Sequence, residues 1–200
     1  GISVALGYTG ADFRTARRAV AYGARVATHL FDTMPPLHHR NLSVTTVLLT
    51  DDRVIAEVIA DGVHIHPSMI QLVVRAKGPR RVALVTGSTF AAGLPDGVYT
   101  RGGRHIVVEN GVARLGGRDG PLAGGTSTMA EAFANVHQFP GVTLDEASCM
   151  TAATPAYIIG MSHEIGRLEV GMRADITVLD HDGSVWMTIV GGKIAYAKES

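Results

Sequence analysis

The apolar positions of the first ninety residues fall into short continuous runs that alternate with stretches of helical spacing. The short, β-rich runs predict strands over Ile2–Leu6, Arg25–Leu30, Val54–Ala60 and Arg81–Thr86. Helical spacing predicts helices over Ala11–Tyr22 and Pro67–Ala76, and a loop with a short amphipathic stretch precedes the third strand. Proline suits the start of a helix because the first turn leaves its N–H unbonded anyway. Strands joined by helical crossovers indicate a parallel α/β sheet.

The pattern changes after Ala91. Short strand-like runs with glycine turns predict a β-hairpin excursion near residues 97–116, made of Val98–Thr100, His105–Glu109 and Val112–Leu115. The glycine-rich segment Leu122–Thr128 then predicts a loop that leads into a helix over Met129–Gln138. Thr143 is a suitable N-cap for a further helix over Leu144–Ala152.

The last forty residues alternate apolar and polar positions around glycine turns, in GRLEVGMRADITVLD and VWMTIVGGKIAYA. This alternation predicts a small terminal β-layer. We therefore expect two domains, with residues 1–160 forming the α/β part that carries the hairpin and residues 161–200 forming the small β-layer domain.

Composition excludes several classes of function. Eighteen lysine and arginine residues balance eighteen aspartate and glutamate residues, so we expect neither nucleic acid nor an anionic membrane as a partner. No apolar run approaches the roughly 18 residues of a membrane span, and the first residues lack the layout of a signal peptide. Cys149 is the single cysteine, which excludes an internal disulfide and fits a reducing compartment. We expect it to be a small apolar group on a helix.

Polar residues gather where the predicted strands end: Tyr8, His29, Asp61 with His64, and Thr86 to Ser88. In parallel α/β folds, and above all in (β/α)8 barrels, the carboxyl ends of the strands carry the chemistry. Four strand–helix units make only half of such a barrel. Since the chain also opens directly on a strand, we expect it to be part of a longer protein, with two parallel sheet edges left unpaired.

Five segments in order, GYTG, THLFDTMPPLHHR, IADGVHIHP, LVTGST and LAGGTSTM, fall at turns that would face one rim. Together they resemble the N-acetylglucosamine-6-phosphate deacetylase family, in its C-terminal half. The tail GRLEVGMRADITVLD is similar to the closing signature of the wider amidohydrolase superfamily. The resemblance implies an α/β fold, namely the C-terminal half of a metal-dependent-hydrolase (β/α)8 barrel with a small terminal β-sandwich layer.

The resemblance also implies the chemistry. The family hydrolyses the acetamide of a phosphorylated amino sugar to glucosamine 6-phosphate and acetate, in amino-sugar catabolism in the cytoplasm, and its members form homodimers. A divalent metal, zinc by preference, polarises water for attack on the acetyl carbonyl. An aspartate after the last barrel strand takes the proton of the water and returns it to the departing amine.

Carried over by position, His29 is a metal ligand and His64 contacts substrate. Arg40 corresponds to the arginine that binds phosphate in a neighbouring subunit. The remaining substrate-binding positions are Asp32 and Thr33, where the family has Asn-Ala, and the loop Leu122, Ala123 and Gly124.

Several positions depart from the family pattern. Tyr8 stands where the family has its second metal-binding histidine, and Gly87 stands where it has the catalytic aspartate. The third metal ligand, a glutamate, falls upstream of this chain. Asp32 would repel a phosphate, and the other replacements are Leu42 and Ser43 for Pro-Gly and Gly125 for serine. No catalytic residue is therefore intact, and we expect the hydrolase activity and the metal occupancy to be impaired.

Alternatives remain open at this point. His64 and His66 form an H-x-H pair that would share one face of a strand and bind metal, although Pro67 favours a turn there. The chain could be a non-catalytic remnant that binds a sugar phosphate or a partner chain, or another amidohydrolase that acts on a cyclic amide. Arg40 and the LAGG loop favour a phosphosugar over a cyclic amide. Each departure can arise from one transition in a codon, which is the hypothesis of a decayed or mutagenised copy.

Overall fold

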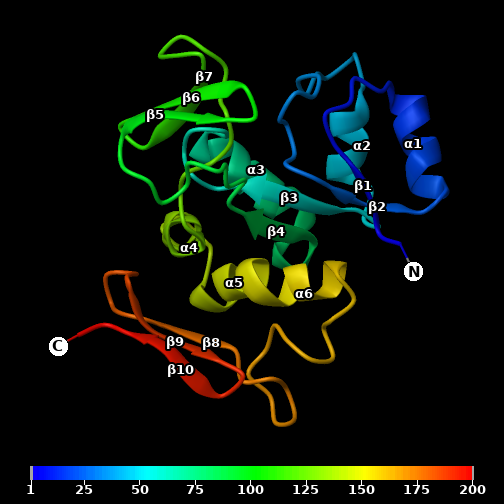
Figure 1. Cartoon of the computed structure of the whole chain (residues 1–200). Helices are drawn as coiled ribbons and strands as arrows, with labels where there is room; N and C mark the ends of the chain where they lie inside the picture. The colour runs from blue at the N-terminus through cyan, green and yellow to red at the C-terminus, as the bar shows by residue number, and fades with distance from the viewer. Residues whose placement is uncertain (1, 200) are drawn as a thin grey trace.

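A computed structural model describes residues 2–199 of the chain. Its centre is a parallel sheet of four strands in the order β1-β2-β3-β4, and the strands are β1 (Val4–Leu6), β2 (Ala24–Ala27), β3 (Ile55–Ile59) and β4 (Val82–Val85). Figure 1 shows this sheet with helices between successive strands. The predicted α/β class is confirmed, although the observed strand bounds differ from the predicted ones by up to three residues.

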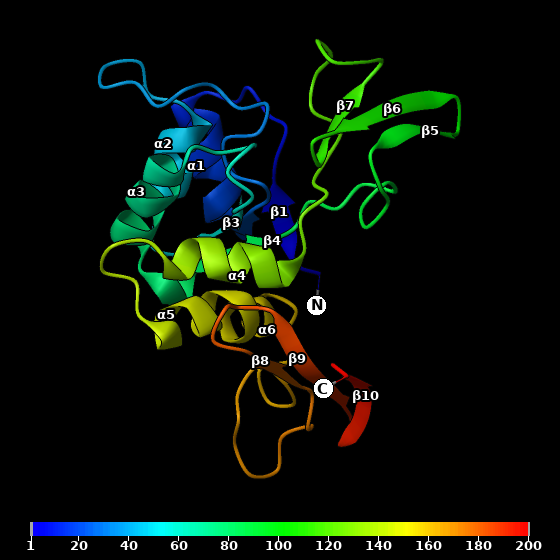
Figure 2. The same ribbon diagram turned by 90° about the vertical axis from the view of Figure 1, so that its left-hand side faces the viewer.

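Helices cover one face of the sheet (Figure 2). They are α1 (Phe13–Ala21), α2 (Val44–Thr50), α3 (Pro67–Lys77) and a short 3-10 turn, η1 (Pro79–Arg81). Asp12 caps α1 by accepting a hydrogen bond from the Thr15 N–H at 2.7 Å. At the start of α2, the Thr46 Oγ1 accepts from the N–H of the N-cap residue Ser43 at 3.4 Å. We predicted only a short amphipathic stretch there, whereas five of the seven residues of this helix are buried.

The main hydrophobic core lies between this sheet and its helices. Val20, Leu48, Val58, Val73 and Leu84 are each at most 1% exposed and belong to one packed cluster. β3 is central, and four of its five residues are buried. Because the strands are buried in this core, it holds in place the polar turns that follow them.

The sheet is open at both edges in the part of the chain that the structure describes. β1 pairs only with β2, and Ile2 beside it is 95% exposed. Beyond β4, an isolated parallel bridge joins Ser88 to Gly125. The four strands therefore form an arc and not a closed barrel.

A second unit is the predicted hairpin. Its antiparallel strands are β5 (Gly97–Arg101), β6 (Arg104–Glu109) and β7 (Val112–Leu115). It has its own small core of four buried residues, Ala91, Ile106, Val108 and Ala113. Asp96 holds the β6–β7 turn, because its carboxylate accepts from the backbone N–H groups of Asn110 and Gly111. The hairpin prediction is confirmed.

Four helical segments follow the hairpin, and α5 and α6 lie below the sheet in Figure 1. α4 (Met129–His137) starts from Thr128, and a continuous rod comprises α5 (Leu144–Ser148), the π-helical segment η2 (Cys149–Ala153) and α6 (Thr154–Ile158). The predicted end at Ala152 is wrong, since the rod continues through Pro155. Proline lacks an N–H, and it follows a π-helical turn where the regular hydrogen-bond ladder is already interrupted. Cys149 is half-buried on this rod, as expected for a structural thiol.

The chain ends in an antiparallel sheet of order β10-β9-β8, set apart at the lower end of Figure 1. Its strands are β8 (Ile176–Leu179), β9 (Val185–Val190) and β10 (Lys193–Ala197). None of their residues is buried, so these strands form one layer, and the second layer of a sandwich is not seen among residues 2–199. Among the helices of residues 2–199, we find none with the length and apolarity that a membrane crossing requires.

Candidate functional site

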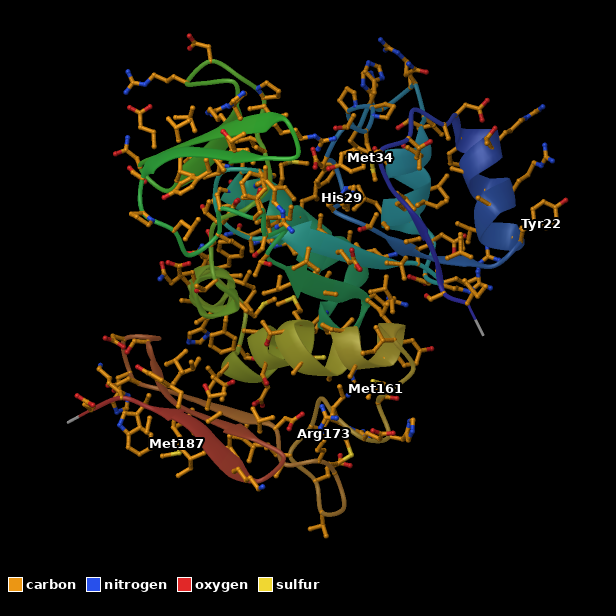
Figure 3. The ribbon with its side chains drawn as sticks, viewed as in Figure 1. Tyr22, His29, Met34, Met161, Arg173 and Met187 are labelled. Atoms are coloured by element: carbon orange, nitrogen blue, oxygen red, sulfur yellow. The ribbon has the colours of Figure 1, made fainter. Side chains whose placement is uncertain are left out.

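The parallel strands bring the predicted polar turns to one rim of the sheet. Tyr8 follows β1, His29 follows β2, Asp61 and His64 follow β3, and Gly87 follows β4. Figure 3 shows His29 at this rim and Met187 at the opposite end of the molecule, on the terminal sheet. The expected gathering of strand-end residues is therefore present, and the terminal sheet takes no part in it.

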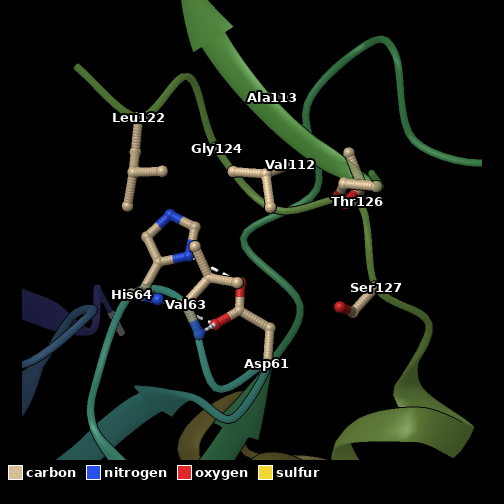
Figure 4. Close-up of a pocket in the computed structure, with 10 residues that line it drawn as sticks. Asp61, Val63, His64, Val112, Ala113, Leu122, Gly124, Thr126 and Ser127 are labelled. Atoms are coloured by element: carbon tan, nitrogen blue, oxygen red, sulfur yellow. Dashed lines mark hydrogen bonds and ion pairs between the residues drawn. The ribbon is translucent and has the colours of Figure 1, made fainter. Parts of the chain in front are cut away.

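The turn after β3 is held by Asp61. Its Oδ1 accepts from the backbone N–H groups of Val63 and His64, each at 2.9 Å. Its Oδ2 lies 2.6 Å from the His64 Nδ1. Both side chains are buried, at 6% and 7% exposed. Every Asp61 oxygen is thus used, and the imidazole ring is fixed in one orientation (Figure 4).

Electrostatics couple this pair. The hydrogen bond that His64 donates to Asp61 raises the pKa of His64 above 6.5, against the opposing effect of burial. For Asp61, burial alone would raise the carboxyl pKa, but hydrogen bonds from the His64 ring and two backbone N–H groups lower it below 3.8. The Asp61 carboxylate therefore favours the imidazolium form of its partner.

A small pocket with a volume of about 20 Å³ opens beside this turn. His64, Leu122 and Gly124, which we predicted to bind substrate, all line it. Further lining comes from Asp61 and Val63, from the β6–β7 turn at Gly111, Val112 and Ala113, and from Thr126 and Ser127. The sequence did not reveal the hairpin as a wall of this site, because nothing local indicates that the Gly111 carbonyl accepts from the Thr126 hydroxyl.

The other predicted members of the site lie elsewhere. Ala123 packs against the core of the hairpin, and its N–H donates to the Ala113 carbonyl at 2.9 Å. Asp32, Thr33 and Arg40 belong to the loop after β2 and do not line the cavity. Arg40 is exposed, and among residues 2–199 no ion pair joins its guanidinium.

At the ends of β1 and β2, the rings of Tyr8 and His29 are in contact, with centroids 4.2 Å apart and planes tilted by 46°. Both have positive φ, 46° and 35°, a backbone conformation that is uncommon outside glycine. The His29 Nδ1 is buried without a hydrogen-bond partner in the described part of the chain. Burial, then the charge of Asp32 and a hydrogen bond with it, raise the pKa of Tyr8 above 10.0. The phenol therefore stays protonated and is a poor metal ligand.

These residues do not fit a complete metal site. The orphaned nitrogen of His29 could serve as one ligand, but a catalytic zinc takes three protein ligands. Within residues 2–199, no group of three or more His, Cys, Asp or Glu side chains gathers as a metal site would require. The second histidine position is filled by a protonated phenol, so this arrangement supports no catalytic step through a metal.

The H-x-H pair does not lie on one strand face. His64 bonds to Asp61, whereas His66 is the N-cap of α3, and its Nδ1 accepts from the Ser68 N–H at 3.2 Å. The turn that Pro67 favoured is confirmed, and no metal group of three forms around the pair within residues 2–199.

The position expected to hold the catalytic aspartate is part of a close glycine contact. Gly87 has φ +60°, and a Cβ built there would lie 2.5 Å from Ile59 Cδ1. Its carbonyl accepts from the Gly125 N–H at 2.7 Å, and the Gly125 carbonyl accepts from the Thr89 N–H at 2.9 Å. A Cβ on Gly125 would lie only 2.0 Å from the Thr86 carbonyl oxygen. The two departures from the family pattern, Gly87 and Gly125, therefore contact each other.

The chain matches the Amidohydrolase family over residues 7–195. It is 36% identical over 196 residues to an N-acetylglucosamine-6-phosphate deacetylase of Vibrio furnissii, covering 98% of this chain and 48% of that protein. It is 35% identical to an N-acetylgalactosamine-6-phosphate deacetylase of Escherichia coli O157:H7, covering 97% of this chain and 51% of that protein.

Among solved structures, the N-acetylglucosamine-6-phosphate deacetylase of Pasteurella multocida superposes with a TM-score of 0.92 at 34% identity, covering 99% of this chain and 51% of that one. The chain thus spans about half the length of the curated relatives it matches. The match is continuous from the rim residues to the terminal sheet. By this match, the chain is a member of the Amidohydrolase family.

Proposed function

We propose that this chain is the phosphosugar-binding part of a deacetylase for N-acetylated amino sugar phosphates, and that it binds such a ligand without hydrolysing it. The observation that carries the proposal is the cavity that His64, Leu122 and Gly124 line together. Two relatives of similar identity are named for the glucosamine and galactosamine substrates. The ligand class is therefore the 6-phosphate of an N-acetylated hexosamine.

The residues of this chain have distinct parts in this function. His64 offers its free ring nitrogen to an oxygen of the ligand, and Arg40 binds phosphate in a neighbouring copy as part of a homodimer. Thr33 and the backbone of Leu122 to Gly124 complete the contacts to the sugar. Asp32 opposes the phosphate charge and weakens binding.

Hydrolysis needs two more functions. A divalent metal, in our proposal zinc, polarises water in this family when bound, and His29 is the ligand that this chain offers. Gly87 has no group that could take the proton of the water or return it to the amine, and general acid–base groups contribute roughly 10²–10⁴-fold to rate. We therefore expect acetate release to be lower by at least that range than in an intact family member.

The same proposal extends to architecture and location. We propose that residues 1–160 form the C-terminal half of a (β/α)8 barrel and that residues 161–200 form a separate small β-domain, part of a sandwich. A reducing cytoplasmic location suits the single half-buried thiol of Cys149 and the phosphorylated substrate class.

Calorimetric titration with N-acetylglucosamine 6-phosphate and with its galactosamine epimer tests the binding claim, and an enzymatic acetate assay with added zinc tests the hydrolysis claim. We expect saturable heat without acetate. His64→Gln should weaken binding, and His163→Gln, which changes an exposed histidine, should not. Acetate release at the rate of an intact deacetylase would overturn the claim of impairment, and absence of binding heat would overturn the function.

A further inference from the structure

Asp61 is engaged entirely by the turn and by His64. One carboxylate oxygen accepts two backbone N–H groups, at 2.9 Å each, and the other meets the His64 Nδ1 at 2.6 Å. At 6% exposed, Asp61 leaves little surface for a ligand. Any effect of Asp61 on a ligand must therefore act through His64.

The second nitrogen of His64, Nε2, points away from Asp61 and toward the side of the cavity where Leu122 lies (Figure 4). A carboxylate only accepts hydrogen bonds, so the Nδ1 facing it must carry a proton. Nε2 is then the nitrogen that gains or loses a proton. It is a cationic donor when His64 is charged and a lone pair when His64 is neutral.

We propose that Asp61 is a positioning residue that fixes His64 with Nδ1–H toward its carboxylate and Nε2 toward the ligand, so that a charged Nε2–H donates to an acceptor oxygen of the bound phosphosugar. The inference rests on the proposed function for the identity of the ligand. The orientation of His64 itself does not depend on it.

The groups that face His64 favour this charged form. Asp61 raises the pKa of His64 most, burial opposes it, and the charge of Asp32 adds a smaller increase. The cavity wall opposite is uncharged, with Thr126, Ser127 and the Gly111 turn. An anionic or oxygen-rich ligand would therefore meet one localised positive donor.

Asp61→Asn isolates the contact with His64. The asparagine Oδ1 can keep both backbone hydrogen bonds of the turn, while its NH₂ replaces the oxygen that faces Nδ1. Because an amide N–H donates, Nδ1 must then accept, and Nε2 carries a proton in the neutral ring. The variant thus presents a neutral donor, in place of a donor that is charged at low pH and absent at high pH.

In calorimetry with N-acetylglucosamine 6-phosphate, the ratio of the dissociation constants of Asp61→Asn and the wild type should therefore depend on pH. We expect Asp61→Asn to bind about tenfold more weakly than the wild type near pH 5.5, since a hydrogen bond to a charged group is stronger. The gap should close as the pH rises through the folded pKa of His64, which Asp61 raises above 6.5. Titration of the ligand phosphate affects both proteins alike, so a ratio that is constant with pH would overturn the proposal.

A double-mutant cycle separates positioning from support of the turn. If Asp61 acts through His64, adding Asp61→Asn to His64→Gln should cause no further loss of affinity. An equal loss in both backgrounds would contradict the proposal. Asp182→Asn is the matched control, because the Asp182 carboxylate accepts from the Ser184 N–H at 2.8 Å on the terminal sheet. It should leave affinity unchanged.

An NMR titration without ligand gives an independent readout. The His64 ring resonance, identified by its loss in His64→Gln, should titrate with a pKa above 6.5 in the wild type and at a clearly lower pH in Asp61→Asn. If the wild type binds no phosphosugar but this midpoint falls as expected, the proposed function fails and the positioning of His64 stands. An unchanged midpoint would overturn the positioning itself.

Discussion

The turn after β3 and the strand ends of β1 and β2 lie on the same rim, but their buried polar atoms differ in whether they are hydrogen bonded. Both oxygens of Asp61 are hydrogen bonded, and the ring of His64 is held at 7% exposed. Across the rim, the His29 Nδ1 is buried without a partner in the described part of the chain, beside a Tyr8 that is 64% exposed.

This difference separates the two tasks of a deacetylase. The side that would contact the sugar keeps its bonding intact, because Asp61 and His64 are partners within the chain itself. The side that would hold the metal and move the proton has an orphaned nitrogen, a protonated phenol and a glycine contact. Under the proposed function, the binding surface would persist where the residues for the chemistry are replaced.

Gly125→Ser is the substitution with the largest expected effect, and it tests whether the glycine contact is a fixed part of the fold. Its Cβ would lie 2.0 Å from the Thr86 carbonyl oxygen, so backbone must move and the hydrogen bonds at 2.7 and 2.9 Å to Gly87 and Thr89 weaken. We expect a loss of about 3–5 kcal/mol in the free energy of unfolding, from overpacking plus lost hydrogen bonds. Urea denaturation measures it.

Gly10→Ser is the control, since a Cβ on Gly10 would meet nothing within 4 Å, and its cost should be a few tenths of a kcal/mol. A loss for Gly125→Ser as small as that of the control would mean that the family serine is tolerated. The backbone around Gly87 and Gly125 would then not depend on glycine at position 125.

Gly87→Asp comes next, and it would return the expected catalytic carboxylate. The backbone φ of +60° disfavours a side chain, and the new Cβ would lie 2.5 Å from Ile59 Cδ1. We expect a destabilisation of about 2–3 kcal/mol from left-handed backbone and overpacking together. The residue alone should not restore acetate release, because the metal ligands remain incomplete.

Two further variants separate the destabilisation by Gly87→Asp into a part from the left-handed backbone and a part from the contact with Ile59. Gly93→Asp has φ +77° with nothing within 4 Å of its Cβ, so it reports the backbone part alone. Ile59→Val removes the clashing Cδ1, and Gly87→Asp should cost less in that background. Equal costs for Gly87→Asp and Gly93→Asp, measured by urea denaturation, would show that the contact with Ile59 is unimportant.

The sequence predicted the parts of this molecule that follow from local pattern. Strand and helix periodicity indicated the α/β class and the hairpin, and the strand-end rule placed Tyr8, His29 and His64 on one rim. The sequence did not predict contacts between distant segments. Nothing near Gly111 indicates that its turn walls the cavity, and nothing near Gly87 indicates that its carbonyl pairs with Gly125. Such contacts depend on how separate units pack, and a single sequence does not encode that in any local pattern.

The smallest expected effect concerns the intact side, where His64→Gln should change how stability depends on pH. The folded pKa of His64 is raised above 6.5, so its stabilisation is fully present below 6.5 and is lost as pH rises through the folded value. The folded pKa of Asp61 is lowered below 3.8, so its share is present above 3.8 and is lost as pH falls through the folded value. The pair is therefore strongest between these two ordinary values.

Urea denaturation of wild type and His64→Gln should give a difference of about 1 kcal/mol near pH 5.5 that shrinks as the pH rises through the folded pKa of His64. His163→Gln is the matched control, because His163 pairs with Glu164 at 3.5 Å while 72% exposed, and exposed ion pairs contribute little. If the His64→Gln difference stays constant across this range, the buried pair is not coupled by charge. The contrast between a satisfied side and an unsatisfied side of the rim would then rest on hydrogen-bond geometry alone.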